Sequence, residues 1–168
     1  MARALLLFVF AYMAGSTAMA AGCRFLNLPI NPVTGNNGEV FQGESEAVKV
    51  RFDNFKTEGS VEVFPDSQLG ITDKRANATC AIDGGVWARK DIYVSVDNAV
   101  LLAHEFSGSN DFLNFYAIDS CKKLGEIDIS NSSWSFDRGN ISVFRQAGKN
   151  KSAGLKTYAL SKYCFPDK

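Results

Sequence analysis

The stretch IYVSVDNAVLLAHEFSGSNDFLNFYAIDSCKKLGEIDI, residues 92–129, decides the fold. Runs of four to seven mostly apolar, β-branched and aromatic residues alternate here with turns built from Asp, Asn, Gly and Ser. Short strands that recur roughly every 8–12 residues, with such turns between them, are typical of an antiparallel meander. The stretch therefore predicts strands over residues 92–96, 100–106, 112–118 and 126–129.

The same pattern extends outward in both directions. Upstream, Val48, Val50 and Phe52 share one face of a predicted strand. No segment of twelve or more residues shows a helical period. We therefore expect an all-β fold, a single disulfide-linked antiparallel β-sandwich or small β-barrel built from a meander. The further strands that we predict cover residues 47–52, 60–64, 134–136, 141–145 and 155–160.

Two details refine this expectation. Residues 66–85 show no period and are rich in polar and turn residues, so we expect a long loop held by Cys80. Phe112 and Tyr116 alternate with Phe115, which predicts a strand buried on both faces. Residues 112–129 resemble one hairpin of a propeller blade, but the chain supplies at most three blades of about forty residues and a propeller needs at least four.

The N-terminus has the composition of a secretory signal peptide. Arg3 precedes an apolar run over residues 4–14, which is too short to span a membrane as a helix. Ala18 and Ala20 place small residues at the −3 and −1 positions of a signal peptidase site. We expect a signal peptide over residues 1–20, a single β-rich domain over residues 21–168, and an exported protein that is periplasmic or extracellular.

Cys23 raises the alternative of a lipid anchor. The residues before it resemble a lipoprotein box, but Ala20 stands where Leu is usual. Lipidation would also leave three cysteines, an odd number in an oxidising compartment. We favour the form without a lipid anchor. No other apolar run approaches twenty residues, so we expect no membrane span.

The four cysteines predict two disulfides in an exported chain. Three pairings are possible, and the sequence alone does not choose among them. We favour Cys80–Cys121 together with Cys23–Cys164, which would tie the mature ends together. The cysteines are widely spaced and the chain has one histidine, so we expect no metal site and no cofactor.

The charge balance argues against a nucleic-acid partner. Without Arg3 the chain has 17 basic and 18 acidic side chains, a net charge of 17 − 18 = −1. Nucleic-acid binders gain their affinity from a basic excess that neutralises phosphates. We expect a protein or a cell-envelope ligand as the partner instead.

The sequence contains no convincing catalytic constellation. His104, the only histidine, lies mid-strand on a face that it shares with Val100, Leu102 and Phe106. A catalytic triad would need a nucleophile beside it and an acid behind it, and the chain has no G-x-S-x-G motif. We expect His104 to be a structural residue, assign no catalytic residues, and expect the protein not to be an enzyme.

The candidate partner-binding residues lie in and near turns. They are Ser107, Gly108, Ser109, Asn110 and Asp111 in one turn, with Trp87 and Trp134 as exposed anchors.

Two short motifs resemble the C-type lysozyme inhibitors, which are small periplasmic or lipid-anchored β-barrels. Tyr158 and Lys162 fit the Y-x-x-x-K pattern of that family. Residues 107–111 begin like its S-G-x-x-Y loop but end in Asp111 in place of Tyr. The resemblance covers these two motifs only. It implies an inhibitor class and assigns no residue roles.

Our leading interpretation is an exported, non-catalytic recognition module of unknown target, an inhibitor or immunity-type protein that acts through loops on a β scaffold. The first alternative is a structural or assembly component of the cell envelope, for which exposed strand edges would be the signature. The second is a small secreted hydrolase built on His104 or on an acid pair.

Overall fold

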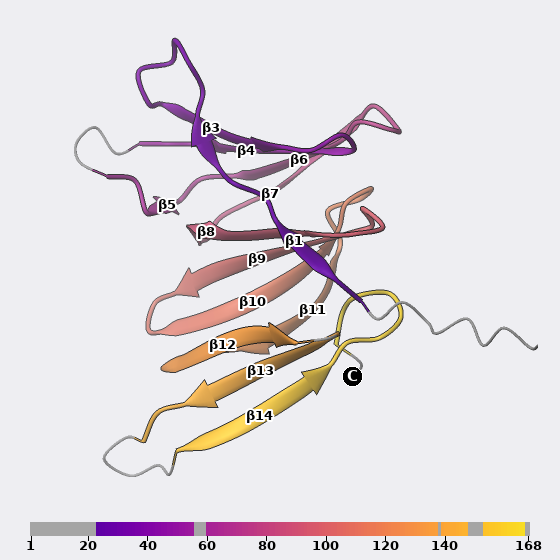
Figure 1. Ribbon diagram of the computed structural model, residues 1–168. Helices are drawn as coiled ribbons and strands as arrows, with labels where there is room; N and C mark the ends of the chain where they lie inside the picture. Colours follow the sequence, from indigo (N-terminus) through magenta and orange to yellow (C-terminus); the bar gives the residue numbers. More distant parts are fainter. Residues whose placement is uncertain (1–22, 56–59, 138, 148–152, 167–168) are drawn as a thin grey trace, which may run out of the picture.

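The computed structural model describes residues 23–55, 60–137, 139–147 and 153–166. Three antiparallel sheets are stacked on one another in this part of the chain (Figure 1). The prediction of an all-β, antiparallel and disulfide-linked fold is confirmed. The expected signal peptide over residues 1–20 lies outside the described residues. Within them, no helix is long and apolar enough to span a bilayer.

Apart from β1 (Phe25–Asn27) and β5 (Val63–Pro65), which belong to the central sheet, the strands follow the chain from the first sheet to the third (Figure 1). The first sheet contains β2 (Asn31–Pro32), β3 (Val40–Glu44), β4 (Val48–Asp53), β6 (Leu69–Asp73) and β7 (Ala78–Ile82). The central sheet contains β1, β8 (Val86–Ser95), β9 (Val100–Ser107), β10 (Asn110–Ala117) and β11 (Lys123–Asp128), and β5 also pairs with β8. The third sheet contains β12 (Ser132–Asp137), β13 (Asn140–Arg145) and β14 (Gly154–Ala159).

The central sheet is buried on both faces. Successive side chains of a strand point to opposite faces, so in β9 the side chains of Leu101 and Ala103 join the core against the first sheet. Val100 and Leu102 join a separate core against the third sheet. In β10, Tyr116 and Phe115 divide between the two cores in the same way, as the alternation predicted. A strand that is buried on both faces consists of a nearly continuous run of apolar residues in the sequence.

The expectation of a long loop over residues 66–85 is wrong. This segment forms the β6–β7 hairpin of the first sheet. Leu69 and Ile71 are fully buried, but the next inward position holds Asp73, so the apolar alternation lasts for only two residues. The Arg75 guanidinium and the backbone N–H groups of Arg75 and Ala76 donate hydrogen bonds to Asp73. These bonds hold the pKa of the Asp73 carboxyl below its ordinary value.

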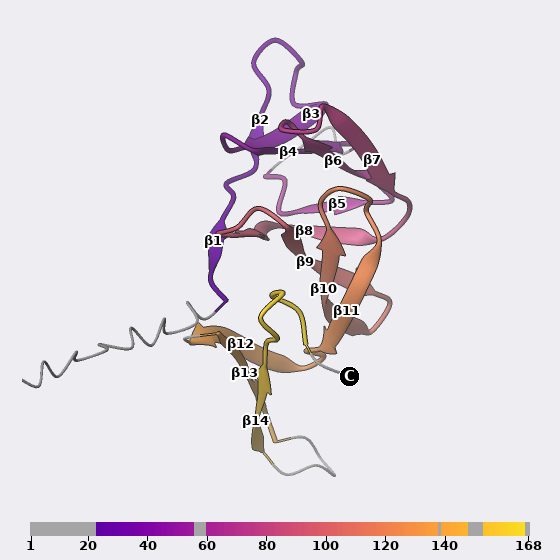
Figure 2. The same cartoon turned by 90° about the vertical axis from the view of Figure 1, so that its right-hand side faces the viewer.

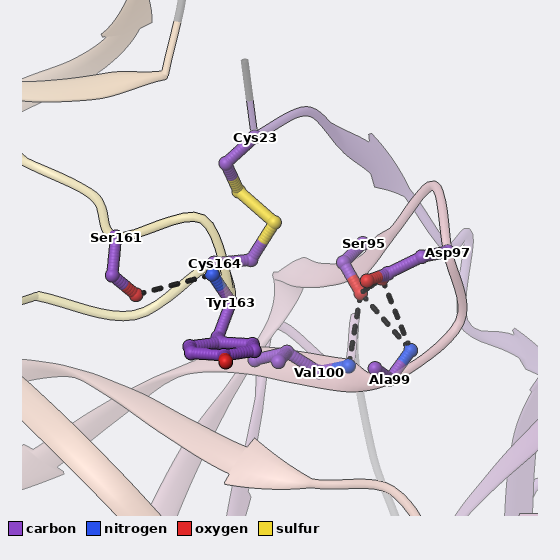
Figure 3. Close-up of a disulfide and its surroundings, with 8 residues drawn as sticks. All are labelled: Cys23, Ser95, Asp97, Ala99, Val100, Ser161, Tyr163 and Cys164. Atoms are coloured by element: carbon purple, nitrogen blue, oxygen red, sulfur yellow. Dashed lines mark hydrogen bonds between the residues drawn. A yellow bond between two sulfur atoms is a disulfide. The ribbon is translucent and has the colours of Figure 1, made fainter. Parts of the chain in front are cut away.

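Two disulfides connect the layers, with the pairing that we favoured from the sequence. Cys80–Cys121 joins β7 of the first sheet to the turn after β10. Cys23–Cys164 joins a residue two positions before β1 to the tail after β14, 141 positions apart (Figure 3). The tail is shaped by the Tyr163 N–H, which donates to Ser161 Oγ at 3.2 Å.

Candidate functional site

The 107–111 turn is the tip of the β9–β10 hairpin. Ser107 pairs with Asn110, which leaves a two-residue loop of Gly108 and Ser109. Gly108 has a φ of 64°, a left-handed conformation that glycine adopts without strain. Residues 107–110 are all exposed. The tip therefore presents small polar side chains and backbone groups on a tightly turned loop.

The base of this tip is fixed to the segment that leads into the third sheet. The Asp111 N–H donates to Ser130 Oγ at 3.0 Å, and the Ile129 N–H donates to the Asp111 carbonyl at 2.9 Å. The Ser130 N–H in turn donates to Asp128 Oδ1 at 2.8 Å. These bonds connect the central sheet to the beginning of β12, so the tip is held from two sides.

A polar groove runs beside the tip. It has a volume of about 790 Å³, and its floor and walls come from β10, β11, β12 and the end of β13. In Figure 1 these segments meet on the left of the stack. Arg145 lines the groove, and its guanidinium lies 3.6 Å from Asp128 Oδ2. The lining residues are Asn110, Asp111, Asp128, Ser130, Asn131, Ser132, Ser133, Arg145, Gln146 and Ala147. Together the tip and the groove make one surface with a projection and a polar hollow.

His104 lies inside the molecule, away from this groove. Its side chain is 11% exposed, its Nδ1 is 3.0 Å from Asp91 Oδ2, and the Phe106 ring packs against it. Its Nε2 is buried and has no partner among the described residues. An enzyme site would need an open cleft beside the acid. Asp91 supplies an acid beside His104, but the His104 ring is enclosed by the protein. This burial fits the structural role that we expected for His104 from the sequence.

The two tryptophans do not sit in the tip or the groove. Trp87 is fully buried in the first core, where its Nε1–H donates to the Ser67 carbonyl at 2.8 Å. The expectation that Trp87 is an exposed anchor is therefore wrong. The pairing of β8 with β9 shifts register between Trp87 and Ile92, and both side chains lie in the first core. Trp134 is half-buried and packs edge-on against Tyr93 and Phe136 in the second core.

A buried polar pair in the central sheet was missed from the sequence. Asn114 is 99% buried and donates from its Nδ2 to the Glu105 carboxylate. Burial raises the pKa of Glu105 and also that of the nearby Tyr116. The signal was available, because strict alternation places Glu105 on the same face as Leu101 and Ala103. Asn114 Oδ1 has no partner in the part of the chain that the structure describes.

The rest of the described chain offers no metal site, and it gives Tyr158 no binding role. Its residues contain no group of three His, Cys, Asp or Glu side chains placed to hold a metal ion. Tyr158, which suggested the lysozyme inhibitors, packs toward the second core with the Lys156 ammonium 4.4 Å from its ring centre. Its surroundings are those of a packing residue.

Comparison with known proteins assigns the family. The family model described as "Immune protein Tsi1" matches residues 23–160. The immune protein Tsi1 of Pseudomonas aeruginosa (strain PAO1) is 35% identical to the chain over 127 residues, which cover 74% of this chain and 73% of that protein. The match spans all three sheets and most of the structure between the two outer cysteines. The chain therefore belongs to the Tsi1 family of immune proteins.

Proposed function

We propose that this protein is an exported, non-catalytic immunity protein that binds a toxic protein and blocks its action. The family supports an immunity-type role, and the observation that carries the proposed binding mode is the braced, exposed tip beside a polar groove. A projection held on a rigid β scaffold enters a partner's cavity with little loss of conformational entropy.

The proposed contact surface comprises the 107–111 turn and the groove next to it. Gly108 and Ser109 would enter the partner first, since they form the end of the hairpin. The groove would receive a matching projection of the partner. Its exposed backbone and hydroxyl groups favour hydrogen bonds over apolar burial, as at many reversible protein interfaces. Trp87 has no part in this surface, and Trp134 contributes through packing.

The proposed location is periplasmic or extracellular, after removal of residues 1–20. The two disulfides support an oxidising compartment, because such bonds persist outside the reducing cytosol. The sequence of the first twenty residues supports export by a cleavable signal peptide. Mass spectrometry of the native protein tests both points. It should show a mature chain that begins at Ala21 and is four protons lighter than its reduced form.

The binding mode is tested by capturing the toxin with the oxidised mature domain from the organism's own extracts. Ser109→Arg places a long charged side chain at the tip, and we expect at least about a tenfold loss of affinity. Thr34→Arg is the matched control, because it adds the same charge to an exposed turn in the first sheet. Equal capture by both variants would show that the tip is outside the interface.

The non-catalytic character has its own test. His104→Ala should leave toxin neutralisation unchanged once the loss of stability is corrected for, since the ring lies away from the groove. Multiple-turnover loss of toxin at substoichiometric amounts of this protein would contradict the proposal. Neutralisation by binding alone requires one immunity protein for each toxin molecule.

A further inference from the structure

The outer edge of the third sheet is open. The strand order of this sheet is β12-β13-β14, and among the described residues no strand pairs with the far side of β14. Five of the six residues of β14 are exposed. Unpaired strand edges present hydrogen-bonding groups that another chain can use as a template.

The register shows which backbone groups face outward. Ala159 pairs with Asn140, and the Leu160 N–H donates to the Gly139 carbonyl at 3.0 Å. This bond makes Ala159 and Asn140 a non-hydrogen-bonded pair, and such pairs alternate with hydrogen-bonded ones along an antiparallel ladder. Lys156 and Tyr158 therefore bond to β13. Leu155, Thr157 and Ala159 direct their N–H and C=O groups away from the sheet.

A cavity lies beside this edge. It has a volume of about 440 Å³ and is lined by Asp128, Val143, Arg145, Gly154, Leu155, Lys156 and Tyr158. Asp128 and Arg145 also line the groove beside the hairpin tip. The cavity therefore continues from the proposed contact surface and leads to the open edge.

The charge around the edge is one-sided. The described residues of this part of the chain, 139–147 and 153–166, contain three basic side chains and no acidic one, although the chain as a whole is balanced at 18 basic and 18 acidic. Arg145 and Lys156 line the cavity, and the acid that lies near Arg145 is Asp128. A second copy of this chain would bring the same positive charge to the edge, whereas an acidic segment would neutralise it.

We propose that β14 accepts an extended, acidic segment of the protein partner as an added antiparallel strand. The outward groups of Leu155, Thr157 and Ala159 form the backbone hydrogen bonds of this addition. Every second side chain of the added segment enters the cavity, where Arg145 and Lys156 bind its carboxylates. The inference rests on the proposed function for the partner being a protein, but it uses a different surface from the hairpin tip.

The test uses the oxidised mature domain and two synthetic peptides. One peptide alternates glutamate and valine, and the other alternates lysine and valine. Fluorescence anisotropy should show that the acidic peptide binds at least about tenfold more tightly than the basic one. Amide NMR shifts should change most at Leu155, Thr157 and Ala159. Rising salt should weaken the binding.

A pair of variants at one position separates backbone pairing from general charge. Thr157→Pro removes an outward N–H and leaves the bonds to β13 in place, as proline does on edge strands. It should reduce acidic-peptide binding at least about tenfold. Thr157→Val keeps the N–H and should bind normally. Lys156→Glu keeps the edge and should reverse the preference between the two peptides.

Several results would overturn the proposal. Equal binding of the two peptides would show that the edge does not select an acidic segment. Unchanged binding of the acidic peptide by Thr157→Pro would show that the peptide does not pair with β14 as an added strand. A dimer that Thr157→Pro dissociates would assign the edge to a second copy. Binding to vesicles of anionic lipid without binding to the acidic peptide would assign it to a membrane. Each outcome is separate from the proposed function, because Ser109→Arg should lose the toxin and retain the acidic peptide.

Discussion

The two cores on either side of the central sheet differ in how they are closed. The first core is rich in aromatic side chains, with the fully buried rings of Phe52 and Phe64 stacked at 4.5 Å. The second core is smaller, and its aromatic side chains Tyr93, Trp134 and Phe136 remain partly exposed. The disulfide Cys23–Cys164 belongs to this second side. The first core has a disulfide of its own, Cys80–Cys121, so each core is supported by one covalent bond. The comparison teaches that the cores differ in size and exposure, and that the proposed contact surfaces border the smaller, more exposed one.

The largest expected effect comes from removing one disulfide at a time. In the loop-entropy model, Cys23→Ser with Cys164→Ser costs up to about 5 kcal/mol of unfolding free energy, and Cys80→Ser with Cys121→Ser up to about 4 kcal/mol, because the closed loops span 141 and 41 positions. Hydrogen exchange locates the loss. Without Cys23–Cys164, protection should fall first in β12–β14. A uniform loss across all three sheets would remove the distinction between the cores.

The next effect compares one aromatic ring from each core. Phe52→Ala should cost about 3–5 kcal/mol, as expected for a fully buried phenylalanine. Phe136→Ala should cost about half as much, since its ring is partly exposed and its site can collapse or admit water. Urea unfolding of both variants measures the difference. If Phe136→Ala proved the more damaging, the second core would be the main source of stability.

A smaller effect is expected where the hairpin tip is braced. Ser130→Ala removes the hydroxyl that accepts the Asp111 N–H, at a cost of about 1 kcal/mol. Toxin affinity should fall with it, because the tip would lose one of its two supports. Ser135→Ala, at an exposed position of β12 that does not line the groove, is the matched control. Loss of stability without any loss of affinity would show that the brace is irrelevant to binding.

The smallest expected effect is a pH dependence of the free energy of unfolding. It comes from Glu105, on the face of the central sheet toward the first core. Burial raises the pKa of Glu105 above its ordinary value of 4.5, so folding disfavours the ionised carboxyl. Stability is therefore lost as the pH rises from the unfolded pKa through the folded one. Glu105→Gln should gain stability relative to the natural protein at pH 7 and gain less at pH 4. Urea unfolding at both pH values tests this. The same difference at each pH would mean that Glu105 is ionised without cost.

The sequence predicted the strands of the central and third sheets well, because their turns contain Asp, Asn and Gly and their cores need apolar residues at every second position. It failed for β6–β7, where Asp73 occupies an inward position and is satisfied by Arg75, a contact that no local pattern reveals. The turn at Ser109 was identified as a candidate from its composition. The groove beside it was not, because Asp128 and Arg145 are brought together only by the packing of two sheets.

The bond between Cys23 and Cys164 has a topological consequence. It makes the chain between these two residues a covalent ring, with the Cys80–Cys121 bond as a crosslink across it. A single cut in an exposed turn, for example between Gly108 and Ser109, would leave two fragments joined by both disulfides and release neither. Even a nicked copy would keep its three sheets tethered, so a protease would have to cut at least twice before any part of the chain between Cys23 and Cys164 could diffuse away.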